Sequence, residues 1–576
     1  MKLNIKNYLM AAAATLLLLT TSCSVEPTFY SQVTPSTFYT SKDAVWDRFN
    51  RPFTHWRWYA GYNETYWGLQ ELGTDEFVLP TRGSDWYDDA KYQKMHHHDY
   101  GDHMWGISDG WRLYAQGVAL ALEAQADLDK NVDFEGLGFT DAERADMLQQ
   151  MNVLIADFYL RGLDLFGGCT IYKSNDDEVV DRSTDVETFN HIDSLLKVAI
   201  PKLTPKQTLG AEETGTISQA TAIMLQARLY FNAKSYIGKE MWNEAAALCQ
   251  DVINGKYGKY SLDEDWTKTF GFDNKSSNEI IWNLPSSATK LNNSGYFTWG
   301  WTVPYNYKNY LGGLDDSGSN NGFGIQPGLN PAGEKYTFKL SGPYQKFNDL
   351  DVRKQNYVYE GGGKYHGMFI VGELQNPLHP EWICTGSREY ARGQWQGKPM
   401  PVVDQCAYMS KYIDGSMNLE EVTALSDVGH AEENSCVRLV KRGPRPDITD
   451  KVLYGEPNIP VIRLAEAYYT LAECKMRTGD KAGAAQLINT VRKRYFEGED
   501  PDPVTEANLD KYRMLDEWMM EFIGEARRRI DLVRWDAYAT EDWWDHKATN
   551  NKNLNRFPIH YSTINANNKI EQNPGY

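Results

Sequence analysis

The stretch VIRLAEAYYTLAECKMRTGDKAGAAQLINTVRKR, residues 461–494, decides the fold of this chain. Apolar residues recur every three or four positions on both sides of Gly479-Asp480, which is the spacing of amphipathic helices. A glycine after the first run and an aspartate before the second are typical of a helix end and a helix start. The stretch therefore predicts two antiparallel helices joined by a tight turn.

The residues around this turn match the packing positions of a tetratricopeptide repeat, a helical hairpin of about 34 residues. Ala472 and Ala484 let two helices approach closely, while Tyr468 and Ile488 fill the space above and below them. Lys475 departs from the pattern, because an aromatic residue is usual at its position. Generic amphipathic hairpins would explain the periodicity, but not the small residues at this spacing.

Helical periodicity recurs along the chain and is lost in its middle. A second pair with small residues at the same places is predicted at 217–231 and 242–253, with an insertion between its helices. Further helices are predicted at 108–128, 141–165, 186–203 and 514–535. Between 261 and 460 the chain is rich in Gly, Asn, Tyr and Trp, with strand-like runs at 279–284 and 368–371.

We therefore predict a mainly α protein, in which tetratricopeptide-like hairpins form an α-α superhelix platform beside a large loop-rich subdomain with short strands. A 200-residue stretch without structure would be unusual in a compact domain, so the middle segment is expected to rest on the helices. The expected units are a signal peptide at 1–22, a helical part with an aromatic loop at 23–260, the loop-rich ligand-binding subdomain at 261–460, and the last hairpin with the C-terminal region at 461–576.

Composition excludes two classes of protein. The 576 residues carry 59 Lys+Arg against 78 Asp+Glu, a net charge of −19, whereas nucleic-acid binders neutralise phosphates with clustered basic residues. A hydrophobic content of 41% is enough for a large core, so intrinsic disorder is not expected. The six cysteines after Cys23 show no paired spacing, so neither a disulfide framework nor a metal cage is predicted.

The N-terminus has the pattern of an export signal. Lys2 and Lys6 precede an apolar run at 9–19, which is too short to span a bilayer of about 30 Å. The following TTSC ends at Cys23 and is similar to a bacterial lipobox, although Thr20 stands where an aliphatic residue is usual. We expect lipidation at Cys23, with an ordinary cleaved secretory signal as the alternative.

Several blocks in the correct order resemble the SusD/RagB family of outer-membrane nutrient-uptake lipoproteins. The most specific are MLDEWMMEFIGEARRRIDLVRW at 514–535 and RFPIHYSTINANNKIEQNPGY at 556–576, and NEIIW at 278–282 and ELGTDEFVLPTRGSDWYDD at 71–89 add to them. FGGCTIY at 166–172 departs from the usual F-G-D-V-P-L, which we expect to alter one turn.

This resemblance implies a surface-exposed outer-membrane lipoprotein that captures glycans and delivers them to a SusC-like TonB-dependent transporter, without catalysis and without a cofactor. A peptide or another nutrient is an alternative ligand within the family. A secreted glycoside hydrolase and a scaffold that closes a transporter without touching ligand are the alternative classes. The chain has no G-x-S-x-G, H-E-x-x-H or P-loop pattern, and its many acidic residues do not by themselves indicate a glycosidase.

Sugar recognition requires flat apolar faces for the ring and planar polar groups for its hydroxyls. Three segments are rich in such residues: 82–89, 296–322 and, more weakly, 388–395. The candidate glycan-binding residues are Asp75, Asp85, Trp86, Tyr87, Tyr296, Trp299, Trp301, Asn320, Asn321, Arg388 and Tyr390.

The sequence neighbours of the tryptophans predict different degrees of burial for them. Trp86 has acidic neighbours and is expected at a surface, although most rings in proteins are core fillers. Trp299 and Trp301 lie on the same face if their segment is extended, and otherwise belong to a hairpin packed on the helices. Trp56, Trp58, Trp67 and Trp282 are assigned to the core.

His96-His97-His98 invites comparison with a metal site. Three adjacent imidazoles cannot all face one ion without a strained backbone, and zinc ligands are usually spaced by two or more residues. We therefore predict no metal here, and expect a polar or glycan-facing surface loop instead.

Overall fold

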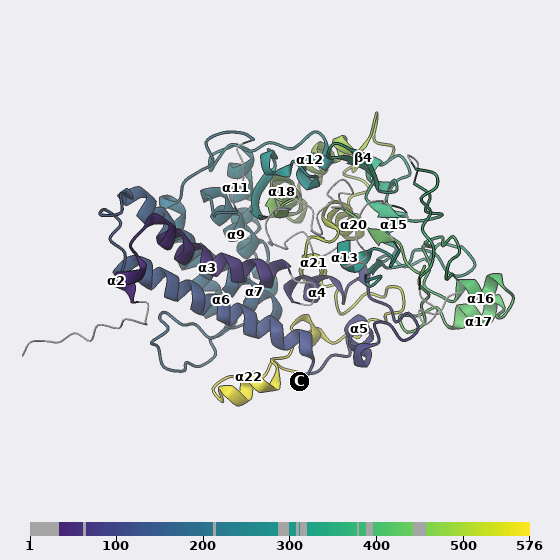
Figure 1. The fold of residues 1–576 in the computed structure, drawn as a ribbon, viewed down its shortest axis with the longest axis horizontal. Helices are drawn as coiled ribbons and strands as arrows, with labels where there is room; N and C mark the ends of the chain where they lie inside the picture. Colours follow the sequence, from purple (N-terminus) through teal and green to yellow (C-terminus); the bar gives the residue numbers. More distant parts are fainter. Residues whose placement is uncertain are drawn as a thin grey trace, which may run out of the picture.

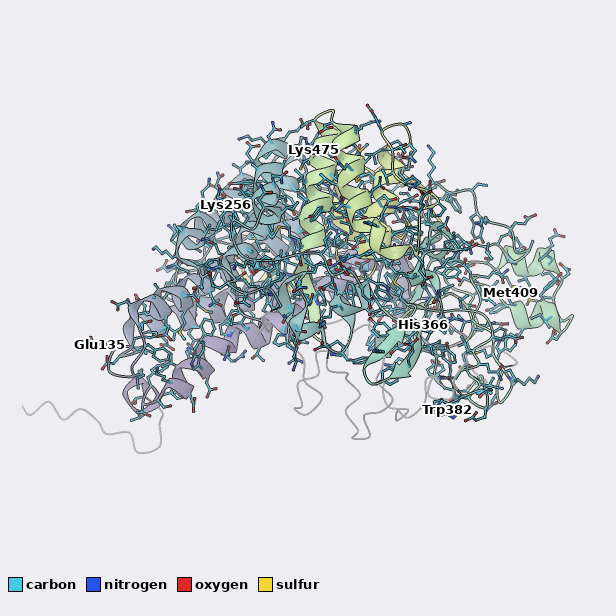
Figure 2. All side chains as sticks on the ribbon, turned by 90° about the horizontal axis from the view of Figure 1, so that it is seen from above. Glu135, Lys256, His366, Trp382, Met409 and Lys475 are labelled. Atoms are coloured by element: carbon cyan, nitrogen blue, oxygen red, sulfur yellow. The ribbon has the colours of Figure 1, made fainter. Side chains whose placement is uncertain are left out.

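The computed structural model describes residues 34–61, 65–210, 215–285, 299–306, 310, 320–376, 379–387, 395–441 and 457–576. Within them, helices dominate one end of the molecule and loops the other, and Glu135 and Met409 lie near the two ends (Figure 2). No helix in the described part of the chain is long and apolar enough to cross a membrane. The six cysteines described there are all free and buried.

The platform is a succession of helices in which each packs on the next (Figure 1). Its members in packing order are α3 (Lys42–Gly61), α6 (Trp105–Lys130), α7 (Asp141–Phe166), α8 (Asp185–Ala199), α9 (Gln219–Phe231), α11 (Trp242–Ile253), α18 (Leu464–Arg477) and α19 (Lys481–Arg492). Local sequence sets their starts: Thr140 and Glu143 form a capping box at α7, and Thr184 and Glu187 form another at α8. The mainly helical fold predicted from the sequence is confirmed.

The hairpin predicted at 461–494 is present. Gly479 makes the turn with φ +99°, and Asp480 caps α19 by accepting a hydrogen bond from the Gly483 amide at 2.8 Å. Ala472 and Ala484 are fully buried where α18 meets α19, which allows the close approach of the two helices. In the second pair, the insertion between α9 and α11 forms the short helix α10 (Ala233–Ile237).

The predicted single helix at 514–535 is wrong, because the chain breaks there. It forms α20 (Lys511–Phe522) and α21 (Arg528–Arg534), with Gly524 and Ala526 in left-handed conformations at φ +76° and +59°. The Gly524 carbonyl accepts a hydrogen bond from Trp67 Nε1, so a contact distant in sequence fixes the break.

The loop-rich region is tied together by two-stranded ribbons. β2 (Ile280–Leu284) pairs antiparallel with β8 (Ile459–Arg463), as the run at 279–284 predicts. The other antiparallel pairs are β1 (Phe77–Val78) with β3 (Gly324–Ile325), β4 (Val358–Gly361) with β5 (Lys364–His366), and β6 (Phe369–Ile370) with β7 (Arg438–Leu439). The predicted boundaries at 260 and 460 stay predictions.

Short helices complete the chain. They are α2 (Pro35–Phe38), α4 (Tyr66–Glu71), α5 (Lys91–His96), α12 (Trp266–Phe270), α13 (Trp299–Thr302), α15 (Pro343–Lys346), α16 (Met409–Ile413), α17 (Leu419–Ala424) and α22 (Tyr561–Ala566). Of the tryptophans assigned to the core, Trp56, Trp67 and Trp282 are buried, as predicted. Trp58 is 40% exposed, so its assignment to the core is wrong.

Candidate functional site

A buried arginine holds the first predicted ligand loop in place. Arg82 is fully buried, and its guanidinium donates hydrogen bonds to four backbone carbonyls at 2.7–3.3 Å, those of Asn321, Gly322, Glu432 and Ser435. One side chain thereby joins the loop at 82–90 to two segments more than 200 positions away. Sequence reasoning missed this role, because a lone arginine beside a glycine carries no signal of burial.

The backbone of this loop is strained. Trp86, Asp88, Asp89 and Ala90 all have positive φ, between +39° and +61°, a region that L residues rarely adopt. Each such residue costs on the order of 1–3 kcal/mol and persists only where surrounding contacts enforce it. Such strain clusters at ligand-binding segments, which supports the choice of this loop as a functional site.

Two indoles meet beside the loop. The Trp86 and Trp301 ring centroids are 4.9 Å apart, and Trp86 Nε1 donates to the Asn320 carbonyl at 3.0 Å. Both indoles are half-buried. Trp301 also stacks on Phe323, with the ring centroids 5.4 Å apart. Gly322 permits this arrangement, since a Cβ there would lie 3.1 Å from Trp86 Cζ2.

The expectation of an extended segment carrying Trp299 and Trp301 on one face is wrong. Both lie in α13, and residues two apart on a helix point in different directions. The Trp299 side chain is outside the described part of the structure. The Trp301 Nε1 is buried and has no hydrogen-bond partner among the described residues.

Acidic residues connect the rings to the third predicted segment. Tyr305 donates its hydroxyl hydrogen to Asp85, and Trp395 Nε1 donates to Glu432 at 3.2 Å. Burial raises the pKa of Glu432, although hydrogen bonds from Ser410 oppose the shift. Because Arg82 binds the carbonyls of Asn321 and Glu432, parts of all three predicted segments belong to one hydrogen-bonded network.

We call Trp86, Tyr87, Trp301, Tyr305 and Trp395 the aromatic surface. Tyr87 is its most exposed member, with 53% of the residue accessible to solvent within the strained loop. The other four are half-buried or buried. The arrangement offers stacking area together with the polar groups of Asp85 and Asn320.

Two predicted ligands do not fit direct contact with a glycan. Asp75 is buried and accepts hydrogen bonds from Arg528 at 2.7 and 2.8 Å; burial alone would raise its pKa, but the guanidinium outweighs this and lowers it. Asn321 is fully buried between the Glu433 carbonyl and Arg438. Tyr296, Arg388, Tyr390 and Cys23 lie outside the described residues.

The histidine run is not the surface loop that we expected. His96 and His98 are buried, and their Nε2 atoms pair with the carbonyls of Trp544 and Gly73 at 3.0 and 2.8 Å. Burial lowers the pKa of His96 to about 3, so its imidazole is neutral at pH 7. His97 pairs with Asp545 at 3.1 Å, and these two residues with His96 offer ligand atoms within 4.8 Å of one another.

Helical hairpins in series beside a loop-rich region with a strained aromatic loop define a tetratricopeptide-like binding platform. A family model described as the SusD family matches residues 278–576, and the chain belongs to this family. The resemblance found in the sequence is confirmed.

Individual proteins show the same relationship. The starch-binding protein SusD of Bacteroides thetaiotaomicron is 28% identical over 457 residues, which cover 76% of this chain and 74% of that protein. Among solved structures, surface glycan-binding protein A from Bacteroides thetaiotaomicron in complex with laminarihexaose has a TM-score of 0.62 at 15% identity, covering 93% of this chain and 100% of that one. A SusD superfamily protein from Parabacteroides distasonis has a TM-score of 0.64 at 15% identity, covering 95% and 100%. At these identities the solved structures establish a shared fold.

Proposed function

We propose that this protein binds glycans at the aromatic surface, at the outside of the outer membrane, and delivers them to a SusC-like TonB-dependent transporter. The observation that carries the proposal is the strained loop at 82–90, which a buried arginine holds, and in which Tyr87 is exposed and the preceding residue, Trp86, packs on Trp301. The starch-binding relative and the neighbour solved with laminarihexaose support a sugar as ligand.

The chemistry of the surface suits a carbohydrate. Aromatic faces bind the C–H side of a sugar ring, and carboxylate and carbonyl oxygens accept hydrogen bonds from its hydroxyls. Asp85 stands beside Tyr305, and the Asn320 carbonyl stands beside Trp86. An extended chain of sugars is expected to lie across these groups rather than in a deep pocket.

We further propose that the protein binds its ligand without cleaving it. A glycosidase needs one carboxyl group free to donate a proton and another free to attack or to activate water. Three carboxylates around the rings are engaged by protein donors: Asp85 by Tyr305, Glu432 by Ser410 and Trp395, and Glu433 by Ser387. This engagement supports a binding role.

A glycan array with the purified protein identifies the ligand class, and isothermal titration of Trp86→Ala and Trp301→Ala then tests the surface. Each lost stacking face should weaken binding by about 1–3 kcal/mol. Because both indoles are half-buried, melting temperatures must be measured in parallel. Binding only of peptides, or unchanged glycan affinity in both variants, would contradict the proposal.

The delivery step and the lipid anchor have their own test. Mild detergent extraction should copurify a TonB-dependent barrel in equal stoichiometry, and fatty-acid label should depend on Cys23. Cys23→Ala should lose the label and leave the outer-membrane fraction. A native protein that runs alone in several gentle detergents, with blank crosslinking, would leave a free-standing surface binder.

A further inference from the structure

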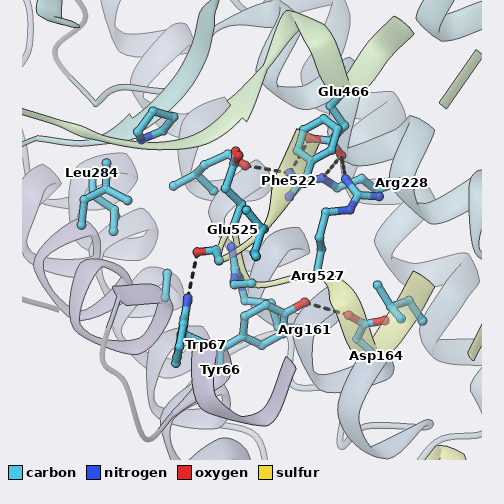
Figure 3. A pocket seen from close by; sticks show the side chains of 18 of the residues that line it. Tyr66, Trp67, Arg161, Asp164, Arg228, Leu284, Glu466, Phe522, Glu525 and Arg527 are labelled. Atoms are coloured by element: carbon cyan, nitrogen blue, oxygen red, sulfur yellow. Dashed lines mark hydrogen bonds and ion pairs between the residues drawn. The ribbon is translucent and has the colours of Figure 1, made fainter. Parts of the chain in front are cut away.

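A cavity of about 150 Å³ lies where the helical platform meets the loop-rich region (Figure 3). A volume of this order accommodates a single six-membered ring. Trp67 lines the cavity, and its ring centroid lies 4.9 Å from that of Phe323. Phe323 is the ring on which Trp301 stacks. The cavity is therefore separate from the aromatic surface but only two ring contacts away from Trp301.

Arg161 gives this cavity an unused set of hydrogen-bond donors. Its side chain is 6% exposed, its Nε donates to Asp157 at 2.7 Å, and its guanidinium lies 4.3 Å from the Tyr66 ring centroid. Neither Nη atom has a hydrogen-bond partner in the part of the chain that the structure describes. An acceptor bound inside the cavity that Arg161 lines would give these two nitrogens charge-assisted hydrogen bonds.

The other charged groups on the cavity wall are already paired. Glu466 accepts a bidentate interaction from Arg228 at 2.6 and 2.7 Å and has Arg527 at 3.5 Å. Asp164 accepts hydrogen bonds from the hydroxyls of Tyr66 and Tyr236, and burial raises its pKa. The acidic groups thus have partners, and Arg161 is left with free donors.

We propose that this cavity is a second ligand site, which takes a one-ring molecule bearing a single carboxylate. The two carboxylate oxygens accept hydrogen bonds from the two Nη atoms of Arg161, a geometry that guanidinium favours. The ring lies against apolar wall residues such as Trp67 and Phe522. This chemistry is shared by sugar acids and by aromatic acids, and the site does not depend on glycan binding at the aromatic surface.

Isothermal titration of the whole protein with glucuronate, benzoate and their uncharged methyl esters tests the proposal. We expect saturable binding of at least one acid, and at least tenfold weaker binding of its ester, because the ester carries no charge and loses the charge-assisted hydrogen bonds to Arg161. Binding of glucuronate alone assigns a sugar acid, and binding of benzoate alone assigns an aromatic acid. Absence of saturable heat with both acids would overturn the proposal.

Two cavity variants and one matched control locate the bound acid. Arg161→Met removes the donors, while Asp157 keeps its hydrogen bond from Trp56. Ala60→Leu keeps Arg161 and fills the cavity from its wall, so it tests the site even if Arg161→Met does not fold. Both should lose binding at least tenfold, whereas Arg144→Met, on the same helix α7 but 40% exposed, should not. Binding retained in Ala60→Leu and in any folded Arg161→Met would overturn the assignment to this cavity.

Discussion

The helical platform and the aromatic surface are stabilised in different ways. In the α18–α19 hairpin, Ala472 and Ala484 are buried where two helices meet, and the backbone groups of each helix bond to one another. Around the aromatic surface, buried carbonyls have few ladder partners, so Arg82 and Arg438 donate to them instead. The platform therefore depends on distributed apolar packing, and the surface depends on a few buried cations.

Replacing the buried cation Arg82 is expected to cause the largest loss of stability. Arg82→Met leaves the carbonyls of Asn321 and Gly322 without a donor among the described residues, because those of Glu432 and Ser435 also accept from the Ser435 amide and from Arg438. The substitution should lower the free energy of unfolding by about 2–5 kcal/mol, measured by urea denaturation. Arg112→Met is the matched control, because that side chain is 53% exposed and forms an ion pair with Asp109. A cost for Arg82→Met no larger than that of the control would show that the surface is not held by this arginine.

Overpacking the hairpin should have a smaller effect. Ala472→Leu inserts a larger side chain between α18 and α19 and should cost about 1–3 kcal/mol in the same unfolding experiment. Ala482→Leu makes the same change at an exposed position of α19 and should stay within about 0.5 kcal/mol. Equal stability of the two variants would contradict the close helix packing.

A pH comparison probes the buried histidines that tie α5 to the C-terminal segment. Burial lowers the pKa of His546 to about 4, and its Nδ1 pairs with the His96 carbonyl at 2.8 Å. The unfolded chain takes up a proton near pH 6.5 and the folded one does not, so this group destabilises the fold as pH falls from 6.5 toward 4.

His546→Asn keeps a donor for the carbonyl and removes the titration. The free energy of unfolding of the wild type should therefore fall by about 2 kcal/mol more than that of the variant between pH 7 and pH 5. Urea unfolding of both proteins at both pH values measures this difference. Taking the difference between the two proteins cancels the contribution of other titrating groups. An identical pH dependence in both proteins would show that His546 is protonated in the fold.

The same contrast explains what the sequence predicts and what it does not. The helices at 141–166 and 464–492 are predictable because periodicity and caps are local. The break between α20 and α21 is not, because it depends on the contact of Gly524 with Trp67. The burial of Asp75 likewise depends on Arg528, 453 positions away. The sequence around Asp75 does not show this ion pair, so the prediction that Asp75 contacts the glycan is wrong.

Within the candidate site, composition identified the loop at 82–89 but not the hydrogen bonds from Arg82 that hold it. Acidic neighbours predict Trp86 at the surface, but that ring is half-buried against Trp301, and its neighbour Tyr87 is the exposed one. The helical turn of α13 was also missed, because four residues are too few for a period to be seen. Burial of individual rings is a property of the tertiary fold.

The central claim, that the aromatic surface binds glycan, is tested most directly by comparing two exposed tyrosines. Tyr87 on the strained loop is 53% exposed and Tyr561 at the start of α22 is 50% exposed, so truncating either should leave the melting temperature unchanged. Isothermal titration with the glycan selected on the array should show binding weakened by about 1–3 kcal/mol in Tyr87→Ala and unaltered in Tyr561→Ala. Equal affinity of the two variants, with both fully folded, would contradict the claim.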